Sequence, residues 1–191
     1  MLQCEMITVA VSTRLPNRGW TYAEYCRIPE DGKRHEIIDG RHYVTPAPDF
    51  YHQEVALGLA SELRAKIRNK GRGRVGIAPT DVLLGPGLIV QPDVVAVRTS
   101  RAAIVGLKKI TGTPDLVVEV LSPRTQRRDR GVKMRGYERA GVAEYWLVDP
   151  KQQTIAVYVL KQGKFVAVGE CTERIESHAF PGVVIDLREI W

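Results

Sequence analysis

Cysteines and long apolar runs are scarce in this chain, and each scarcity excludes a class of protein. Only three residues are cysteines, and Cys4, Cys26 and Cys171 lie far apart with no C-x-x-C pair. This pattern argues against a disulfide framework and against a cysteine zinc site. No run of about 18 apolar residues occurs, so we expect no membrane-spanning helix. Residues 1–11 have no basic start before an apolar stretch, so we expect no signal peptide and a cytoplasmic location.

The composition is that of a globular protein. The chain has 191 residues, of which 44% are hydrophobic and 26% are charged, which is enough for a core without disulfides. No repeat, low-complexity block or linker divides it. We therefore expect one domain over residues 1–191, beginning with an irregular segment at residues 1–19 that contains a short strand at residues 6–11.

Positive charge is concentrated in two stretches of a chain whose net charge is +6. Residues 64–74 hold six basic side chains and no acid, and residues 124–139 hold seven against Asp129 and Glu138, which leaves the remainder acidic. Clustered positive charge suits a phosphate-backbone partner such as nucleic acid. Helix ends also favour lysine and arginine through the helix dipole, so the charge alone leaves both interpretations open.

Two apolar stretches each carry a carboxylate, at residues 91–97 and 114–123. Their valines and leucines are typical of strands covered on both faces, yet Asp93 begins the first run and Glu119 interrupts the second. A buried carboxylate needs a metal, a cation or hydrogen-bond donors. Two such carboxylates on neighbouring strands would form a metal site.

The first half of the chain predicts two helices and four strands. Thr21 and Glu24 form a capping box that should start a helix, with Trp20 and Tyr25 spaced as a hydrophobic staple. Apolar residues recur every four positions in a second, long helix. The expected segments are a hairpin at residues 35–45, a helix at 51–69, and an antiparallel pair of strands at 75–84 and 88–97 that carries Asp93 on its second strand.

The second half predicts a crossover unit. A strand at residues 115–121 is followed by a helix with Thr125 as its N-cap, ending near residue 140, and then by a strand at residues 144–148. The two strands should be parallel and close together. With further strands at residues 154–160, 164–168 and 183–186, we expect a central mixed β-sheet flanked by helices, of the α/β or α+β class.

One stripe of the crossover helix carries polar residues. Asp129, Lys133 and Tyr137 are spaced i, i+4 and i+8, so they lie on one face. Glu119 lies near the carboxyl end of its strand, where open α/β sheets place ligands. If the stripe faces the strand ends, Lys133 approaches the carboxylates.

These segments together resemble the PD-(D/E)xK restriction-endonuclease-like superfamily, and in particular its bacterial branch of uncharacterised endonuclease-like proteins. The resemblance covers about residues 20–190, and its motifs are specific as an ordered set. The matching segments are residues 35–40, 91–94, 114–123, 128–131 with Lys133, and 141–150.

The resemblance implies a restriction-endonuclease-like fold and metal-dependent cleavage of phosphodiester bonds, with nucleic acid, most naturally DNA, as partner. It implies that Asp93 and Glu119 are the catalytic acids that bind Mg²⁺ or Mn²⁺, which prefer oxygen ligands, and that Glu36 is an additional acid. The usual lysine, two residues after the second acid, is replaced by Leu121. Lys133 is therefore the candidate for a migrated catalytic lysine that orients water or neutralises the phosphate.

Each of these residues also has a structural interpretation. Asp93 follows a proline and could bend a strand, Glu119 could pair with Arg124 or Lys133, and Glu36 could be an exposed hairpin residue. Lys133 alone would be an ordinary solvated helix lysine. Three further residues are expected to be structural: His52 as a capping or packing residue, Asp115 as a strand-start residue, and Tyr137 as a packing residue.

Two other functions remain open from the sequence. The first is a non-catalytic nucleic-acid-binding or regulatory module that retains the nuclease fold, suggested by Leu121 and the basic stretches. The second is a self-associating structural protein that uses the Tyr145 and Trp146 strand and the C-terminal hairpin as its interface. A homodimer is expected by analogy with nucleases that cut two strands with two subunits.

Overall fold

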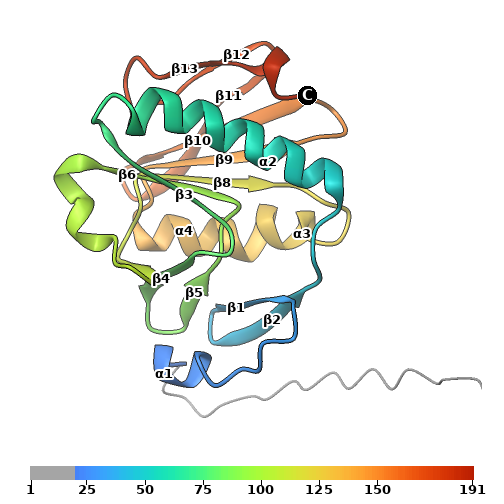
Figure 1. Cartoon of the computed structure of the whole chain (residues 1–191), viewed down its shortest axis with the longest axis vertical. Helices are drawn as coiled ribbons and strands as arrows, with labels where there is room; N and C mark the ends of the chain where they lie inside the picture. The colour runs from blue at the N-terminus through green and yellow to red at the C-terminus, as the bar shows by residue number, and fades with distance from the viewer. Residues whose placement is uncertain (1–19) are drawn as a thin grey trace, which may run out of the picture.

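The structure is a computed structural model that describes residues 20–191 (Figure 1). The expected irregular segment at residues 1–19, with its short strand, lies outside the described residues. A six-stranded mixed sheet forms the centre, in the order β11-β10-β9-β8-β6-β3. Its strands are β3 (Gly73–Ile77), β6 (Val94–Arg98), β8 (Leu116–Val120), β9 (Glu144–Asp149), β10 (Thr154–Lys161) and β11 (Lys164–Cys171).

A second, five-stranded sheet lies below the first in Figure 1 and has the order β2-β1-β5-β4-β7. Its strands are β1 (Arg34–Ile38), β2 (Arg41–Thr45), β4 (Asp81–Gly85), β5 (Leu88–Val90) and β7 (Lys109–Thr111). The strands β12 (Arg174–Glu176) and β13 (Val184–Asp186) form a small separate ladder near the C-terminus.

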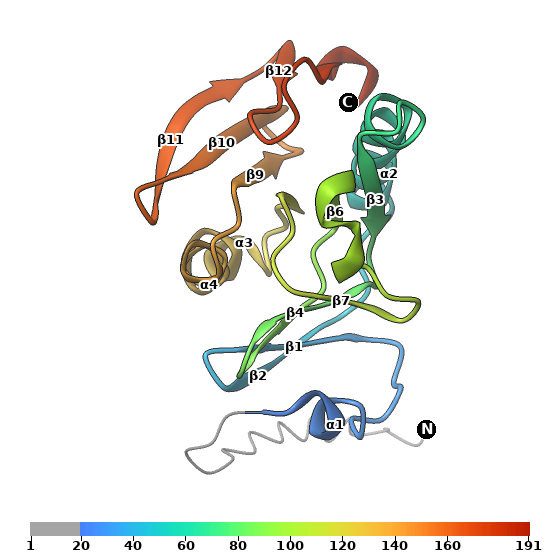
Figure 2. The ribbon, with the colours of Figure 1, turned by 90° about the vertical axis from the view of Figure 1, so that its left-hand side faces the viewer.

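Helices cover both faces of the six-stranded sheet, and one further short helix lies beside the second sheet (Figure 2). The main ones are α1 (Tyr22–Tyr25), α2 (Phe50–Leu63), α3 (Gln126–Arg128) and α4 (Met134–Ala140). A π-helical turn at Arg64–Arg68 extends α2, and another at Asp129–Lys133 joins α3 to α4; short 3₁₀ turns lie at Thr99–Ile104 and Leu187–Glu189. In the described part of the chain, no helix has the length and apolarity that a membrane crossing requires.

Strand alternation divides the core into two layers, as the sequence pattern predicts. Val94 and Ala96 of β6 pack with the buried face of α2, whereas Val95 and Val97 pack with α4 and the five-stranded sheet. The apolar stripe that runs along α2 and into the π-helical turn after it is fully buried, and consists of Val55, Leu59, Leu63 and Ile67. The expected mixed sheet flanked by helices is therefore confirmed.

The predicted crossover unit is also confirmed. Strands β8 and β9 are parallel neighbours, with Glu119 opposite Leu147, and β6 is antiparallel to β8 on its other side. The helix between them ends at Gly141, which has the left-handed conformation expected of a C-cap glycine. Thr125 occupies the N-cap position before α3, as predicted, but its side chain makes no capping hydrogen bond; its N–H donates to the Ser122 hydroxyl at 3.3 Å.

The expected antiparallel pair at residues 75–84 and 88–97 is wrong in one respect. Both arms are interrupted, so that β3 pairs with β6 in the large sheet and β4 pairs with β5 in the small one. The interruptions lie at Pro79 and Pro92, which have no N–H to donate to a ladder. Asp93 consequently lies in the bend before β6, and not within a strand.

The strand that carries Tyr145 and Trp146 is not exposed on the surface of the protein. Both side chains are fully buried in strand β9, in the centre of the large sheet. The sequence interpretation that these aromatic residues belong to a self-association interface is therefore wrong, because parallel pairing with β8 and antiparallel pairing with β10 place them inside the core.

Candidate active site

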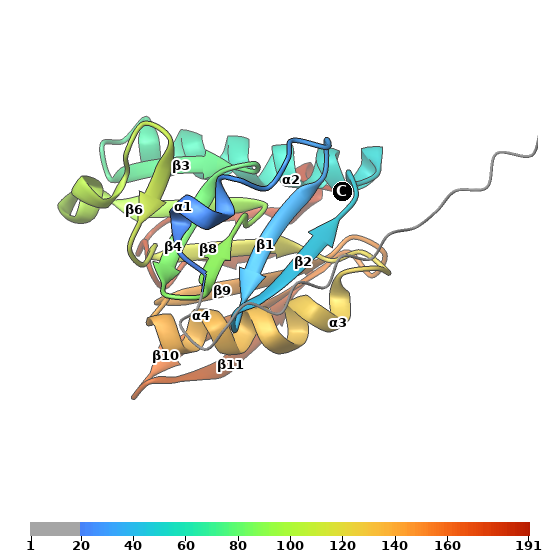
Figure 3. The same cartoon turned by 90° about the horizontal axis from the view of Figure 1, so that it is seen from below.

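The residues singled out in the sequence meet in one cavity of about 400 Å³. It lies where the carboxyl end of β8, the first turn of α2, the β1–β2 hairpin and the α3 region come together; Figure 3 shows how the hairpin approaches these elements. Asp93, Glu119, Lys133 and Glu36 all line it, and each is at most 3% exposed. Four elements that are distant in sequence therefore place their ionisable groups at one point.

Asp93 is held by three donors. Its Oδ1 is 2.5 Å from Arg34 Nη1, and its Oδ2 accepts the Val120 N–H at 2.8 Å and lies 3.3 Å from His52 Nε2. Burial raises the pKa of the carboxyl, but the His52 hydrogen bond and the Arg34 charge outweigh it and lower the pKa to about 2. Asp93 is therefore ionised at neutral pH.

Glu119 has the opposite electrostatic balance. Its Oε1 accepts the Tyr137 hydroxyl at 2.5 Å and lies 2.6 Å from Lys133 Nζ. Burial, followed by repulsion from Asp93, Asp129 and Glu36, raises the pKa of Glu119 to about 8 even though Lys133 opposes the rise. A cation placed beside this carboxyl would relieve that repulsion.

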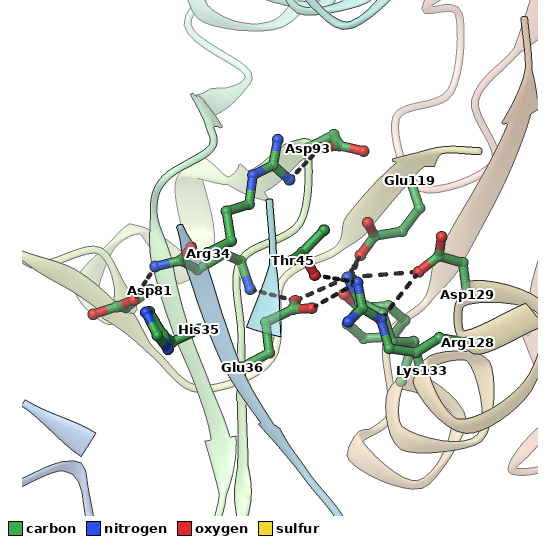
Figure 4. Close-up of polar contacts among 12 residues, drawn as sticks. Arg34, His35, Glu36, Thr45, Asp81, Asp93, Glu119, Arg128, Asp129 and Lys133 are labelled. Carbon is green, nitrogen blue, oxygen red and sulfur yellow. Dashed lines mark hydrogen bonds and ion pairs between the residues drawn. The ribbon is translucent and has the colours of Figure 1, made fainter. Parts of the chain in front are cut away.

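Lys133 lies at the end of the π-helical turn and points into the cavity (Figure 4). Its Nζ is 2.6 Å from Glu119, 2.9 Å from Glu36 and 3.9 Å from Asp129. Burial lowers the pKa of the amine, but the three carboxylates outweigh burial and raise it. Lys133 therefore keeps its charge at neutral pH and does not act as a proton acceptor there. The interpretation of Lys133 as a solvated helix lysine is wrong.

Glu36 is buried at 2% exposure, so the interpretation as an exposed hairpin residue is also wrong. Its Oε1 accepts the Gln91 N–H at 2.9 Å, and its Oε2 lies 3.5 Å from Arg128 Nη2. Burial opposes ionisation, yet Lys133 and Arg128 lower the pKa of Glu36 below its ordinary value. Its contact with Lys133 ties the hairpin to the crossover helix.

The structure adds three residues whose roles the sequence did not indicate. Arg34 and Arg128 pair with Asp93 and Glu36, and His52 contacts both Asp93 and the Val120 carbonyl oxygen, which is 3.0 Å from its Nε2. The sequence could have indicated Arg34, because residues i and i+2 of a strand share a face and Arg34 lies two positions before Glu36. His52 does lie in the first turn of α2, where its N–H donates to Asp49, but its ring reaches the site.

Asp115 stays apart from this cavity. It accepts the Arg98 N–H at 2.8 Å and lies 3.1 Å from Arg101 Nη1, at the opposite end of β8 from Glu119. Its contacts agree with the interpretation of Asp115 as a strand-start residue. Tyr137 does pack in the core, as expected, but its hydroxyl also donates to Glu119.

The donor set of the cavity suits a hard divalent cation. Within residues 20–191, no three His, Cys, Asp or Glu side chains are grouped closely enough to hold a metal by themselves. Mg²⁺ nevertheless retains water and commonly binds through one or two carboxylates plus substrate phosphates. Glu36, Asp93, Glu119 and Asp129 place four carboxylates there, and Asp129 Oδ1 is buried with no hydrogen-bond partner among the described residues. The cavity therefore offers oxygen donors of the kind that such a cation requires.

Comparisons with known proteins bear on the family and the fold. A family model for Uma2, described as "Putative restriction endonuclease", matches residues 22–188. A crystal structure described as a "putative nuclease belonging to DUF820", from Anabaena variabilis, has 20% sequence identity and a TM-score of 0.73, covering 90% of this chain and 97% of that chain. No curated protein matches the sequence. The structural likeness shows the shared fold, the family match spans most of the chain, and the protein belongs to the Uma2 family.

Proposed function

We propose that this protein is a metal-dependent endonuclease that hydrolyses phosphodiester bonds in DNA. The observation that carries the proposal is the convergence of Asp93, Glu119, Lys133 and Glu36 in one cavity. Two carboxylates beside a buried ammonium combine ligands for a cation with a fixed positive charge for the phosphate.

The two acids would hold Mg²⁺ or Mn²⁺ between the end of β8 and the bend before β6. When bound, the cation would supply an activated water and stabilise the charge that develops on the phosphate. Asp93 is ionised and fixed by the Val120 N–H, so it is preorganised as a ligand. Glu119 becomes fully ionised only when a further positive charge offsets its three acidic neighbours.

Lys133 replaces the missing lysine of the usual motif. Leu121, at that position, is 7% exposed and packs in the core with Tyr137. Because Lys133 is charged and held between Glu119 and Glu36, it would orient the attacking water or neutralise the phosphate. Glu36 acts through Lys133 and Arg128 and is a positioning residue in this proposal.

Plasmid nicking tests the proposal. We expect the wild-type protein to nick supercoiled DNA with Mg²⁺ or Mn²⁺, and Asp93→Asn and Glu119→Gln to lose at least about 100-fold in rate. Asp115→Asn is the matched control, because Asp115 also follows a proline and is as buried as Asp93 but lies outside the cavity. DNA left intact by the wild type with several metals, or Asp115→Asn as damaging as Asp93→Asn, would count against catalysis at this site.

A non-catalytic nucleic-acid-binding module is the second candidate. It is favoured by one observation, namely that Asp93 and Glu119 already have the cationic partners Arg34 and Lys133. This function predicts salt-dependent DNA binding without cleavage. Lys133→Met distinguishes the two: loss of turnover with DNA binding retained supports the enzyme, whereas weaker binding with no turnover in the wild type supports the module.

We further propose that the protein acts as a homodimer, which would place two sites on one duplex. Sedimentation equilibrium of the full chain checks this, and a monomer at assay concentrations would refute it.

A further inference from the structure

Arg34 lies between the candidate active site and a second, larger cavity. The second cavity has a volume of about 1310 Å³ and extends between α1, the first half of α2 and the bend after β3. Arg34, His52 and Asp93 line both cavities, so the Arg34 side chain lies at the boundary between the two. The arginine side chain is 21% exposed, and Figure 4 shows its guanidinium directed at Asp93.

Arg34 and Lys133, the two cations that contact the candidate metal ligands, differ in how tightly they are held. Lys133 is 2% exposed and is held among three carboxylates. Arg34 is paired with Asp93, and the second cavity lies beside the Arg34 guanidinium group. Arg34 has room to leave its carboxylate by side-chain rotation, whereas the Lys133 side chain is enclosed and would have to give up three carboxylate contacts.

Both oxygens of the Asp93 carboxylate already have donors in this arrangement. Arg34 occupies Oδ1, while the Val120 N–H and His52 occupy Oδ2. A divalent cation bound by Asp93 and Glu119 needs at least one of these oxygens. The Val120 N–H belongs to the sheet backbone and His52 to a packed helix, so Arg34 is the partner that can make way.

We propose that Arg34 is an exchangeable counter-ion: it neutralises Asp93 while no metal is bound, and it turns to the substrate phosphate when a metal takes its place. The inference rests on the proposed function. A guanidinium binds phosphate through two parallel hydrogen bonds, which a lysine cannot reproduce. Arg34 would thus keep the buried carboxylate stable in the resting protein and become a phosphate ligand during the reaction.

This role has opposite consequences for metal binding and for turnover. Without Arg34, Asp93 keeps an uncompensated charge, so the metal-free protein is less stable and a cation binds more tightly. Turnover falls because the phosphate loses a ligand. An arginine with a purely structural role would lower stability with and without metal and would not tighten metal binding.

The experiment measures Mn²⁺ binding to the intact protein by calorimetry, together with thermal melts and plasmid nicking. For Arg34→Met we expect Mn²⁺ to bind more tightly by about tenfold, the melting temperature to fall without metal, and Mn²⁺ to raise it further than in the wild type. The KM for DNA should rise at saturating Mn²⁺. Arg34→Gln, whose side chain is polar, should change Mn²⁺ affinity, melting temperature and KM in the same directions, and it serves as the test if Arg34→Met folds poorly.

Arg41→Met is the matched control, because Arg41 lies on the same hairpin but is exposed and lines neither cavity. It should leave Mn²⁺ affinity and nicking unchanged. If the wild type binds Mn²⁺ and nicks DNA but both Arg34 variants bind Mn²⁺ equally or more weakly, the counter-ion role is refuted while the proposed function stands. If the wild type neither binds Mn²⁺ nor nicks DNA, the proposed function fails and the inference falls with it.

Discussion

At the residue scale, Asp93 and Glu119 are buried carboxylates with opposite surroundings. Asp93 faces a guanidinium, an imidazole and a backbone N–H, whereas Glu119 shares one ammonium with Glu36 and Asp129. In the metal-free protein Asp93 is therefore charged at pH 7, while Glu119 keeps its proton for much of the time. Cation binding at the pair should release a proton from Glu119.

The raised pKa of Glu119 predicts how stability depends on pH. The folded carboxyl has a pKa of about 8 against an ordinary 4.5, so between these values the folded state binds a proton that the unfolded chain has lost. The free energy of unfolding should fall as pH rises from about 4.5 to 8, by an amount of the order of a few kcal/mol. Urea titrations at several pH values measure this, and Glu119→Gln should flatten the decline.

The pKa of Asp93 is shifted in the opposite direction, so its effect on stability has the opposite dependence on pH. Its folded pKa of about 2 lies below the ordinary 3.8, so its contribution to stability is present above about pH 4 and is lost as the pH falls toward 2. A metal-free protein that gained stability steadily from pH 5 to pH 8 would contradict the assignment of Glu119, and one that lost no stability between pH 4 and pH 2 would contradict that of Asp93.

Tyr137 supports Glu119 through a buried hydrogen bond of 2.5 Å. Tyr137→Phe removes the hydroxyl and leaves Glu119 with one donor fewer, so we expect a loss of about 1 to 3 kcal/mol in the free energy of unfolding. Because the ring still packs against Tyr145, the fold should persist. Tyr158→Phe is the matched control, since Tyr158 also packs against Tyr145 but lies outside the site; an equal loss in both variants would show that the Glu119 bond contributes little.

At the scale of elements, the site depends on how β3 and β6 approach each other. Gly73 of β3 lies opposite Arg98 of β6, and a Cβ at Gly73 would overlap the Val97 carbonyl oxygen. The absence of a side chain is thus a condition for the pairing that leads β6 back to Asp93. Backbone atoms cannot yield as a flexible side chain can.

Gly73→Ala should therefore destabilise the protein by about 2 kcal/mol or more, because β3 must shift away from β6. Chemical denaturation measures the loss. Gly169→Ala on β11 is the control, since a Cβ at Gly169 meets no neighbour within 4 Å, and it should change stability little. Similar effects of the two substitutions would show that β3 accommodates a methyl group at Gly73.

At the scale of the whole molecule, a buried acid connects the C-terminal segment to the central sheet. Glu144 of β9 is fully buried and accepts the Trp146 Nε1–H, the Ser177 hydroxyl, and the N–H groups of His178 and Ala179. Donors from two parts of the chain thus satisfy both oxygens of this carboxyl group. Glu144 is therefore one anchor of the segment that leads to β13, together with Arg98, whose Nε–H donates to the Ala179 carbonyl oxygen at 2.7 Å.

Glu144→Gln turns one acceptor oxygen into an NH₂ group that faces donors, so we expect a loss of about 2 to 4 kcal/mol and earlier proteolysis after β11. Glu176→Gln is the matched control because Glu176 is exposed. Limited proteolysis with mass spectrometry locates the cuts, and a cleavage pattern identical to that of the wild type would contradict the anchoring role.

The two basic stretches should differ in importance for DNA. Arg124 lines the candidate active site, whereas Arg68 lies at the far end of the helix that starts beside the cavity, about 25 Å along its axis. Arg124→Gln should weaken DNA binding and reduce its salt dependence more than Arg68→Gln does. Binding isotherms at several salt concentrations measure both quantities. A larger effect of Arg68→Gln would indicate that DNA binds at the other end of α2.

The sequence by itself determined the elements and the acids. The capping box at Thr21, the stripe of α2 and the crossover between β8 and β9 depend on local spacing, so they could be predicted. Glu119 could be singled out because an acid inside an apolar run is itself a local anomaly. The helical spacing placed Lys133 on one stripe with Asp129 and Tyr137, but that this stripe faces Glu119 came from the structure.

Only the tertiary structure decided which charges pair. Arg34 and Asp93 are 59 positions apart, and His52 and Val120 are 68 apart, so no local pattern links them. Long-range strand pairing likewise divides the expected antiparallel pair at residues 75–84 and 88–97 between two sheets. It also buries Tyr145 and Trp146. Spacing along the chain determines which face a residue occupies, but the partner on that face is set by how the elements pack.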